Sequence, residues 1–262
     1  MEEISVFEEV QAFAKSMGVD FAADEFASLA IDKGIDDQGL AAIREVFDYL
    51  SDKKARKTLE TLLRLSRLPQ KNPKTFENFD FDRLHGEHVA EVRKLPTLAA
   101  LYGHRNLAFI GPEGIGKTHL AQAFGHACCH HGMKSYFLKA TELNDRFVKA
   151  RREGREARVI SSLVKPSCLI IDEMGRCQFD VYSTNMFFDL IDRRYQKEGP
   201  STMIFTSNYG ADQWKSYFSE DSALLCSLDR AFDDAIVFQM KGQSYRGRKL
   251  ERYAIEAGDP QN

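Results

Sequence analysis

The chain has 262 residues, of which 43% are hydrophobic and 29% are charged, and its formal net charge is −3 at pH 7. These values are typical of a soluble globular protein with room for one sizeable domain and a smaller one. No apolar stretch approaches the roughly 18 residues of a membrane-spanning helix, and the start Met1-Glu2-Glu3-Ile4 lacks the basic segment of a secretory signal. The five cysteines have no regular spacing, so we expect reduced thiols, a cytoplasmic location and no membrane partner.

The first part of the chain is predicted to be helical and is unevenly charged. Apolar residues recur at helical spacing over residues 6–13 and 43–50, and Pro69 and Pro73 end the region. Residues 1–52 contain thirteen acidic and three basic residues, whereas residues 53–74 contain eight basic residues and one acidic residue. An acidic segment followed by a basic one suggests two surfaces with different partners, with nucleic acid as a candidate for the basic one. Solvated helix faces also explain such charge runs, so this alternative stays open.

Beyond residue 105 the pattern changes to short apolar segments that alternate with longer helical stretches. We predict strands at Leu107–Ile110, Ser135–Leu138, Cys168–Ile171, Met203–Thr206 and Ala235–Gln239. Helical stretches separate the first four of these strands. The alternation predicts an α/β fold with a mainly parallel sheet that is covered by helices on both faces.

Residues 111–118 read Gly-Pro-Glu-Gly-Ile-Gly-Lys-Thr and satisfy the G-x-x-x-x-G-K-[ST] pattern of a phosphate-binding loop, the P-loop. A predicted strand precedes the loop and a predicted helix, His119–His131, follows it, as the pattern requires. Glycines let backbone N–H groups turn toward phosphate oxygens, and the start of a helix adds partial positive charge. We expect Lys117 to reach the β- and γ-phosphates of ATP and the Thr118 hydroxyl to bind Mg²⁺. The predicted nucleotide-binding residues are Gly111, Pro112, Glu113, Gly114, Ile115, Gly116, Lys117, Thr118 and His119.

Two other predicted strands end in polar residues that suit the chemistry of phosphate transfer. The strand that starts at Cys168 is followed by Asp172 and Glu173. Asp172 is placed to hold Mg²⁺ through water, and Glu173 is placed to orient and polarise the water that attacks the γ-phosphate. Asn208 follows the next strand, and strand ends meet at the ligand crevice, so we expect it to contact the γ-phosphate or the water. An ordinary turn asparagine is the alternative at this position.

Six motifs in a fixed order resemble one group of ATPases. They are Gly-Pro-x-Gly-x-Gly-Lys-Thr-His-Leu-Ala at 111–121, Leu-Ile-Ile-Asp-Glu at 169–173, Arg-Arg-Tyr at 193–195, Thr-Ser-Asn at 206–208, Leu-Asp-Arg at 228–230 and Lys-Gly-x-Ser-Tyr-Arg at 241–246. Together with the segment Thr75–Phe81, they resemble IstB, a transposition-helper ATPase, and its relative DnaC, a helicase loader. The resemblance covers residues 75–250 and is far more specific than the P-loop alone.

The resemblance implies an AAA+ fold, with a five-stranded parallel sheet in the order 5-1-4-3-2 and ATP bound between neighbouring subunits of a homo-oligomer. Arg230 matches the family's arginine finger, a catalytic residue that reaches the γ-phosphate of the adjacent subunit. Arg246 matches a second nucleotide-contacting position, the second sensor. Only 23 residues follow Gln239, so we expect a minimal or absent C-terminal lid.

Residues 141–165 resemble the paired-helix insertion that lines a DNA channel in these ATPases. Seven basic and four acidic residues lie between Lys139 and Arg158. We find no base-reading element in the sequence, so we expect contact with the phosphate backbone of double-stranded DNA and a strong dependence on salt. The predicted DNA-contacting residues are Lys139, Arg146, Lys149, Arg151, Arg152 and Arg155.

Three functional hypotheses follow from these features. The first is an IstB-like ATPase that assembles on target DNA and recruits or activates a transposase. The second is a helicase loader of the DnaC kind, which binds single-stranded DNA and a replicative helicase. The third is a nucleotide-gated binding module with little hydrolysis, and Glu173 argues against it. We assign residues 1–68 to a helical N-terminal domain for partner docking or assembly, 69–81 to a linker, 82–250 to the ATPase domain and 251–262 to a C-terminal tail.

Overall fold

The computed structural model describes residues 4–219, 230–242 and 244. The chain divides into two compact units, Met1–Leu62 and Leu63–Asn262. The predicted C-terminal tail, 251–262, lies outside the described residues, as does most of the region after β5 where a lid was expected to be minimal or absent. None of the helices that are described is long and apolar enough to cross a membrane.

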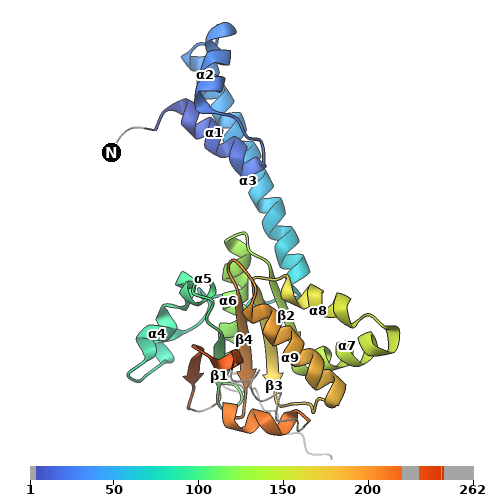
Figure 1. Cartoon of the computed structure of the whole chain (residues 1–262). Helices are drawn as coiled ribbons and strands as arrows, with labels where there is room; N and C mark the ends of the chain where they lie inside the picture. The colour runs from blue at the N-terminus through green and yellow to red at the C-terminus, as the bar shows by residue number, and fades with distance from the viewer. Residues whose placement is uncertain (1–3, 220–229, 243, 245–262) are drawn as a thin grey trace, which may run out of the picture. The chain divides into compact units, whose positions relative to one another are not determined.

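The N-terminal unit is helical, as predicted. It contains α1 (Val6–Met17), α2 (Ala23–Asp32) and most of the long helix α3 (Asp37–Ser66), as Figure 1 shows. Ser5 and Glu8 form a reciprocal capping box at the start of α1, and Gly18, with φ +82°, ends this helix in the left-handed conformation. The rings of Phe7 and Phe26 meet edge to face, 5.7 Å apart between centroids, and so join α1 to α2.

A five-stranded parallel sheet forms the centre of the C-terminal unit. Its strands are β1 (Leu107–Ile110), β2 (Ser135–Lys139), β3 (Cys168–Met174), β4 (Thr202–Ser207) and β5 (Ile236–Gln239). They lie in the order β2-β3-β4-β1-β5, which confirms the predicted order 5-1-4-3-2. β1 and β4 are buried along their whole length, which accounts for the continuous apolar runs in their sequences. β3 continues past its predicted end at Ile171, because Met174 pairs again with Ser207 after an irregularity in the ladder.

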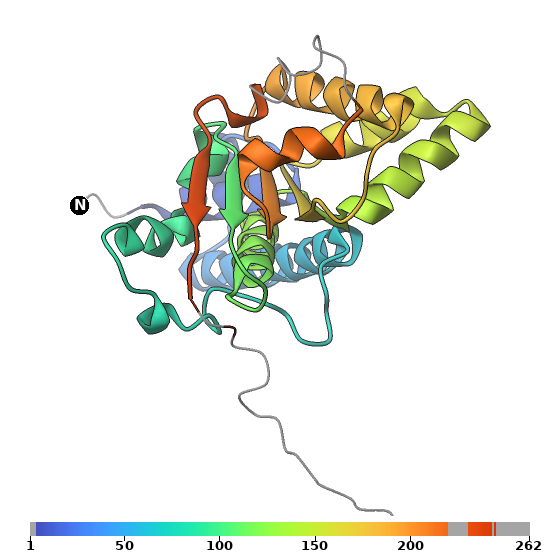
Figure 2. The same ribbon diagram turned by 90° about the horizontal axis from the view of Figure 1, so that it is seen from below.

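Helices cover both faces of the sheet, as predicted (Figure 2). One face carries α7 (Ala140–Glu153), α8 (Glu156–Val164) and α9 (Val181–Tyr195), and the other carries α6 (Lys117–His130). Phe147, Phe187 and Phe205 belong to the core of the first face, and Phe109 and Phe124 belong to the core of the second. Each face therefore has its own hydrophobic core, and the sheet is held rigidly between them.

The segment between α3 and β1 packs onto the α6 side of the sheet. It contains four short helices: η1 (Phe81–Arg83), α4 (Val89–Arg93), η2 (Leu95–Thr97) and α5 (Ala99–Tyr102). Leu68 and Phe76 are buried in the same cluster as Phe124, and Phe79 and Phe81 pack against it. The residues that the sequence assigned to a linker are therefore attached to the core of the C-terminal unit.

One buried arginine joins the ends of several elements on the side of the sheet where the strands begin. The guanidinium of Arg194, in α9, donates six hydrogen bonds, all to oxygens that lie at the end of α8, before β3 and around the start of β4. The acceptors are the carbonyls of Leu163, Val164, Pro166, Ser167 and Thr202 and the hydroxyl of Ser201. Burial lowers the pKa of Arg194 to about 10, so the group stays charged at neutral pH.

Candidate nucleotide-binding site

The P-loop connects β1 to α6, and its three glycines, Gly111, Gly114 and Gly116, all have positive φ. Gly111 has φ +150° and Gly116 has φ +102°, both in the region that favours glycine. A Cβ atom at Gly111 would collide with the carbonyl oxygen of Met240, and one at Gly116 would lie 2.9 Å from the ring of Phe79. Because Gly116 takes the left-handed conformation at the N-cap, α6 begins at Lys117, two residues earlier than predicted.

The ammonium group of Lys117 is directed into the loop. Its Nζ donates to the carbonyl oxygens of Gly111 at 2.7 Å and Pro112 at 2.6 Å. It also donates to Oδ1 of Asn208 at 2.9 Å, although Asn208 lies 91 residues away in the sequence at the end of β4. Two of the predicted catalytic residues thus meet at the centre of the P-loop, where a polyphosphate would accept hydrogen bonds from both.

Asp172 lies at the end of β3 and is almost completely buried, with 3% of its surface exposed. Its Oδ1 accepts hydrogen bonds from the hydroxyls of Thr118 at 2.7 Å and Thr206 at 2.5 Å. Burial raises the pKa of this carboxyl, and the two hydroxyl donors oppose that effect. A hydroxyl and a carboxylate are hard oxygen ligands of the kind that Mg²⁺ prefers, so the residues present fit the predicted metal.

Glu173 has a strained backbone and sits among charged groups. Its φ is +60°, which is unusual for a residue with a side chain, and its N–H donates to Thr206 Oγ1 at 2.9 Å. Its carboxylate lies 3.1 Å from Nζ of Lys139 and 3.7 Å from Nη2 of Arg176. Strain of this kind persists only where the surroundings hold it, and it is typical of functional sites.

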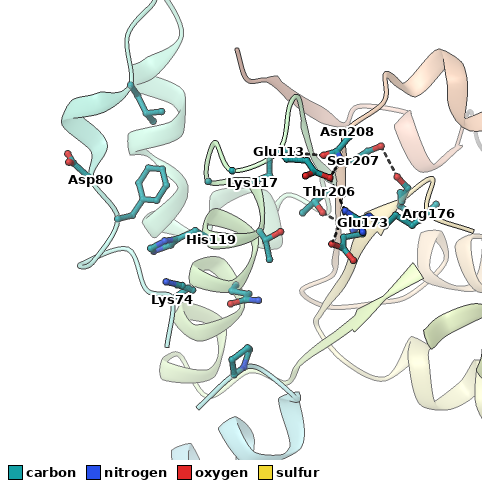
Figure 3. Close-up of a pocket in the computed structure, with 18 of the residues that line it drawn as sticks. Lys74, Asp80, Glu113, Lys117, His119, Glu173, Arg176, Thr206, Ser207 and Asn208 are labelled. Atoms are coloured by element: carbon teal, nitrogen blue, oxygen red, sulfur yellow. Dashed lines mark hydrogen bonds and ion pairs between the residues drawn. The ribbon is translucent and has the colours of Figure 1, made fainter. Parts of the chain in front are cut away.

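A third carboxylate of the site, that of Glu113, belongs to the P-loop itself. Oε1 of Glu113 accepts hydrogen bonds from Nη2 of Arg176 at 2.9 Å and from Nδ2 of Asn208 at 3.2 Å. Figure 3 shows Glu113, Asn208, Arg176 and Glu173 around the same opening. Arg176 and Thr206 were not among the predicted site residues, although Arg176 follows the predicted acidic pair by three residues and Thr206 belongs to the motif that contains Asn208.

Apart from the buried Asp172 and from Lys139, the side chains described above line a cavity of about 1040 Å³. The P-loop and the ends of β3 and β4 form one side, and residues from the range 69–84, including Phe79, form the other. Figure 3 shows Lys74 and Asp80 on this second side. The ring of Phe79 lies 5.0 Å from that of His119, which is hydrogen-bonded to the carbonyl of Thr75 at 3.0 Å. Burial lowers the pKa of His119. The cavity thus places the polar groups of the P-loop and strand ends opposite the aromatic ring of Phe79, which suits the stacking of a base.

The predicted DNA-contacting residues lie on and around α7 and differ in the groups that they contact. Lys149 and Arg152 are exposed and line a shallow groove together with Glu153. Arg155 is paired with Glu153 at 3.2 Å. Lys139 is paired with Glu173, Arg146 lies over the ring of Tyr136 at 5.2 Å, and Arg151 lies over that of Tyr182 at 3.1 Å.

Of the two arginines assigned by resemblance, Arg230 is described and Arg246 is not. Arg230 is exposed, and its Nη1 donates to Oδ1 of Asp192, on α9, at 2.8 Å. This contact lies within one chain, so the in-trans role of Arg230 stays a prediction. The proposed second sensor, Arg246, lies outside the described residues.

A sequence profile of the family described as IstB-like ATP binding protein matches residues 30–252. The chain belongs to this family. It is 37% identical over 198 residues to the insertion sequence IS5376 ATP-binding protein of Geobacillus stearothermophilus, and the match covers 76% of each chain. It is 34% identical over 197 residues to the insertion sequence IS21 ATP-binding protein of Pseudomonas aeruginosa, with 75% of this chain and 72% of the relative covered. The resemblance found from the motifs is therefore confirmed.

Solved structures show the same fold as the IstB-like chain. AMPPCP-bound DnaA from Aquifex aeolicus matches 66% of this chain, which spans 51% of that one, with a TM-score of 0.53 and 21% identity. The DnaC helicase loader matches 63% of this chain and 97% of its own, with a TM-score of 0.50 and 19% identity. At these identities the likeness establishes the AAA+ fold alone. The family and the fold together identify the chain as an ATP-binding AAA+ ATPase.

Proposed function

We propose that this chain is an ATP-dependent regulator of DNA transposition, which assembles on target DNA and recruits or activates a transposase. The observation that carries the proposal is the convergence of Lys117, Glu173 and Asn208 on one cavity, with Asp172 bonded to the lining residue Thr118. The relatives of this chain are named insertion-sequence ATP-binding proteins. ATP binding and hydrolysis would time the encounter between target DNA and the transposase.

The residues of the cavity divide the work of ATP hydrolysis among them. Backbone N–H groups of the P-loop and the ammonium of Lys117 bind the β- and γ-phosphates. Thr118 and Asp172 are the residues that would hold Mg²⁺, which neutralises charge on the phosphates when bound. Glu173 accepts a proton from the attacking water, and Asn208 orients either the water or the γ-phosphate. Phe79 and His119 form the wall against which the adenine base would pack.

DNA binding is proposed for the exposed basic side chains of α7. Lys149 and Arg152 are exposed, and Lys149 lies 3.9 Å from Glu153 in a pair whose lysine side chain stays 74% exposed, so both are accessible to phosphates. The ion pair between Lys139 and Glu173 joins the start of this helix to the proposed catalytic base. A ligand that moves α7 would therefore also alter the surroundings of Glu173.

Electron microscopy of the protein with ATP and DNA tests the proposal. We expect ordered oligomers or filaments on duplex DNA in the presence of ATP, and none with the Lys117→Ala variant. ATPase activity should also rise when duplex DNA and the partner transposase are added. Assembly on single-stranded DNA alone, with no response to duplex, would instead support a helicase loader.

A further inference from the structure

We propose that Arg176 is a ligand of the γ-phosphate in its own subunit, and that the Glu113 carboxylate competes with that phosphate for Arg176 and Asn208. The inference rests on the nucleotide site proposed above and adds to it a residue pair that distinguishes ATP from ADP. The motifs and the family resemblance assigned no role to Arg176, and they assigned Glu113 only as part of the P-loop.

The geometry places a carboxylate where two phosphate-binding donors converge. Oε1 of Glu113 accepts from the amide of Asn208 and from the guanidinium of Arg176, at 3.2 and 2.9 Å. Asn208 also accepts from Lys117, whose ammonium is the principal phosphate ligand of the loop. A phosphate oxygen and a carboxylate oxygen accept the same hydrogen bonds, and arginine binds either of them with charge assistance. The donors that hold Glu113 are therefore equipped to hold a phosphate oxygen.

The loop after β3 directs Arg176 toward this position. The N–H of Arg176 donates to the carbonyl of Glu173 at 3.2 Å, which closes a tight turn. Gly175 in this turn has φ +96°, and a Cβ atom there would lie 2.9 Å from the rings of both Tyr209 and Tyr217. The turn therefore brings the guanidinium back over the end of β3, and Figure 3 shows it beside Glu173 and Ser207 at the mouth of the cavity.

The charges in the opening explain why the two anions compete. Glu113 and the γ-phosphate are both negative, so they repel each other if both remain near Asn208. Glu113 is flexible enough to leave, because 59% of its side chain is exposed, whereas Asn208 and Lys117 are joined by a hydrogen bond inside the loop. ATP would displace the carboxylate and take over Arg176. ADP has no γ-phosphate and would leave the Glu113–Arg176 pair in place.

Isothermal titration with AMPPCP and with ADP, both with Mg²⁺, tests this competition in the full chain. Arg176→Ala should weaken AMPPCP binding by about tenfold, the effect of one charge-assisted contact, and leave ADP binding within about twofold. Glu113→Gln should strengthen AMPPCP binding by roughly three- to tenfold, because it removes one repulsive charge and keeps the shape of the side chain. The two effects should not add in the double variant, since Glu113 acts partly through Arg176.

Arg193→Ala is the matched control. Arg193 is 48% exposed and pairs with a carboxylate at 2.8 Å, whereas Arg176 is 49% exposed and pairs with Glu113 at 2.9 Å. The control should leave the binding of both nucleotides unchanged.

Several outcomes would overturn the inference. Equal losses of AMPPCP and ADP binding in Arg176→Ala would show that the residue does not read the γ-phosphate. A lower rate of hydrolysis with an unchanged ratio of the two affinities would show that Arg176 only positions Glu173. Additive effects in the double variant would show that Glu113 and the γ-phosphate do not compete for Arg176. If the proposed nucleotide site itself is wrong, Lys117→Ala should still bind AMPPCP, and this result distinguishes that case from a failure of the present inference.

Discussion

Glu173 has a left-handed backbone and a carboxylate that faces two cations, Lys139 and Arg176. The irregularity in the ladder between β3 and β4 gives the residue this orientation, and the hydroxyl of Thr206 holds its N–H in place. The catalytic role proposed for Glu173 therefore rests on a backbone that the sheet and its neighbours keep in an unfavourable conformation.

Glu173→Gln should abolish turnover and preserve nucleotide binding. Glutamine has nearly the same shape but cannot take a proton from water, so the rate of phosphate release should fall by about 100-fold or more. The dissociation constant for ATP, measured by titration, should change by less than about threefold, since Lys117 and the P-loop are intact. Wild-type turnover in this variant would assign the base to another residue.

Sequence reasoning places some of these residues well and others not at all. Lys117, Asp172 and Asn208 follow from a loop pattern and from strand ends that must meet at one edge of a parallel sheet. Arg176 does not follow, because its position depends on a tight turn that has no reliable signature in one sequence. Thr206 ends a predicted strand next to Asn208, but its hydrogen bonds to Asp172 and Glu173 depend on the irregular part of β3.

At the scale of elements, Arg194 holds together parts of the chain that secondary-structure patterns treat as separate. It joins the end of α8 to the starts of β3 and β4 from a position on α9. Sequence periodicity detects the helices and strands themselves, but it gives no indication that a charged residue in α9 is fully buried. The motif that contains Arg194 was predicted to mark a family, and the structure adds a physical reason for an arginine there.

Arg194→Lys should destabilise the C-terminal unit by about 3 kcal/mol or more, because an ammonium has three donors and cannot satisfy six acceptors arranged around a planar fork. Urea unfolding followed by circular dichroism measures the change. Arg193→Lys is the neighbouring control on the exposed side of α9 and should alter the free energy of unfolding by less than about 0.5 kcal/mol. Equal effects of the two substitutions would contradict the role assigned to Arg194.

His126 on α6 should make stability depend on pH. Its side chain is buried, and its Nε2 has no hydrogen-bond partner among the described residues. Burial lowers its pKa, and His130 lowers it further, while Glu77 opposes both effects. Because the folded pKa lies below the unfolded value of about 6.5, the unfolded chain binds the proton first and stability is lost as pH falls below that value.

His126→Gln removes this titration and keeps a polar side chain of similar size. The free energy of unfolding, measured between pH 7 and pH 5, should fall less steeply in this variant than in the wild type. Parallel curves for the two proteins would show that other groups control the response to acid.

Lys149 and Arg152, two of the exposed basic residues of α7, should control DNA binding more than Arg151 does. Replacing Lys149 and Arg152 together by alanine should weaken binding to duplex DNA and reduce the slope of log affinity against log salt by about 2. Arg151→Ala should change the slope less, because the guanidinium of Arg151 already lies over the ring of Tyr182. Fluorescence anisotropy over a range of salt concentrations gives these slopes. An unchanged slope in the double variant would remove α7 from the DNA interface.

At the scale of the whole molecule, the order of the five strands was accessible from the sequence only through the family resemblance. Apolar runs locate strands such as Leu107–Ile110, but they carry no information on which strands are neighbours. The boundary between the two units is harder to predict from the sequence than the strands are. α3 runs continuously from Asp37 to Ser66, whereas the compact units divide at Leu62, so a change of unit occurs inside an unbroken helix.

A mixing experiment tests whether the site is shared between subunits. Arg230→Ala should lose ATPase activity and keep ATP binding, because the arginine would act on the nucleotide of a neighbour. Adding the Lys117→Ala variant, which supplies an intact Arg230 but does not bind ATP, should restore part of the activity measured by phosphate release. No recovery at any mixing ratio would argue that Arg230 serves its own chain through Asp192.

At Glu173, the side chain that catalysis requires is not the one that the left-handed backbone favours. Glycine would adopt φ +60° without a steric cost, whereas a residue with a Cβ pays about 1 kcal/mol for it. Selection for hydrolysis must therefore act continuously against substitutions here that would make the protein more robust. In a copy of the gene that is no longer selected for ATP hydrolysis, we expect a substitution of Glu173 by glycine to make the fold more stable.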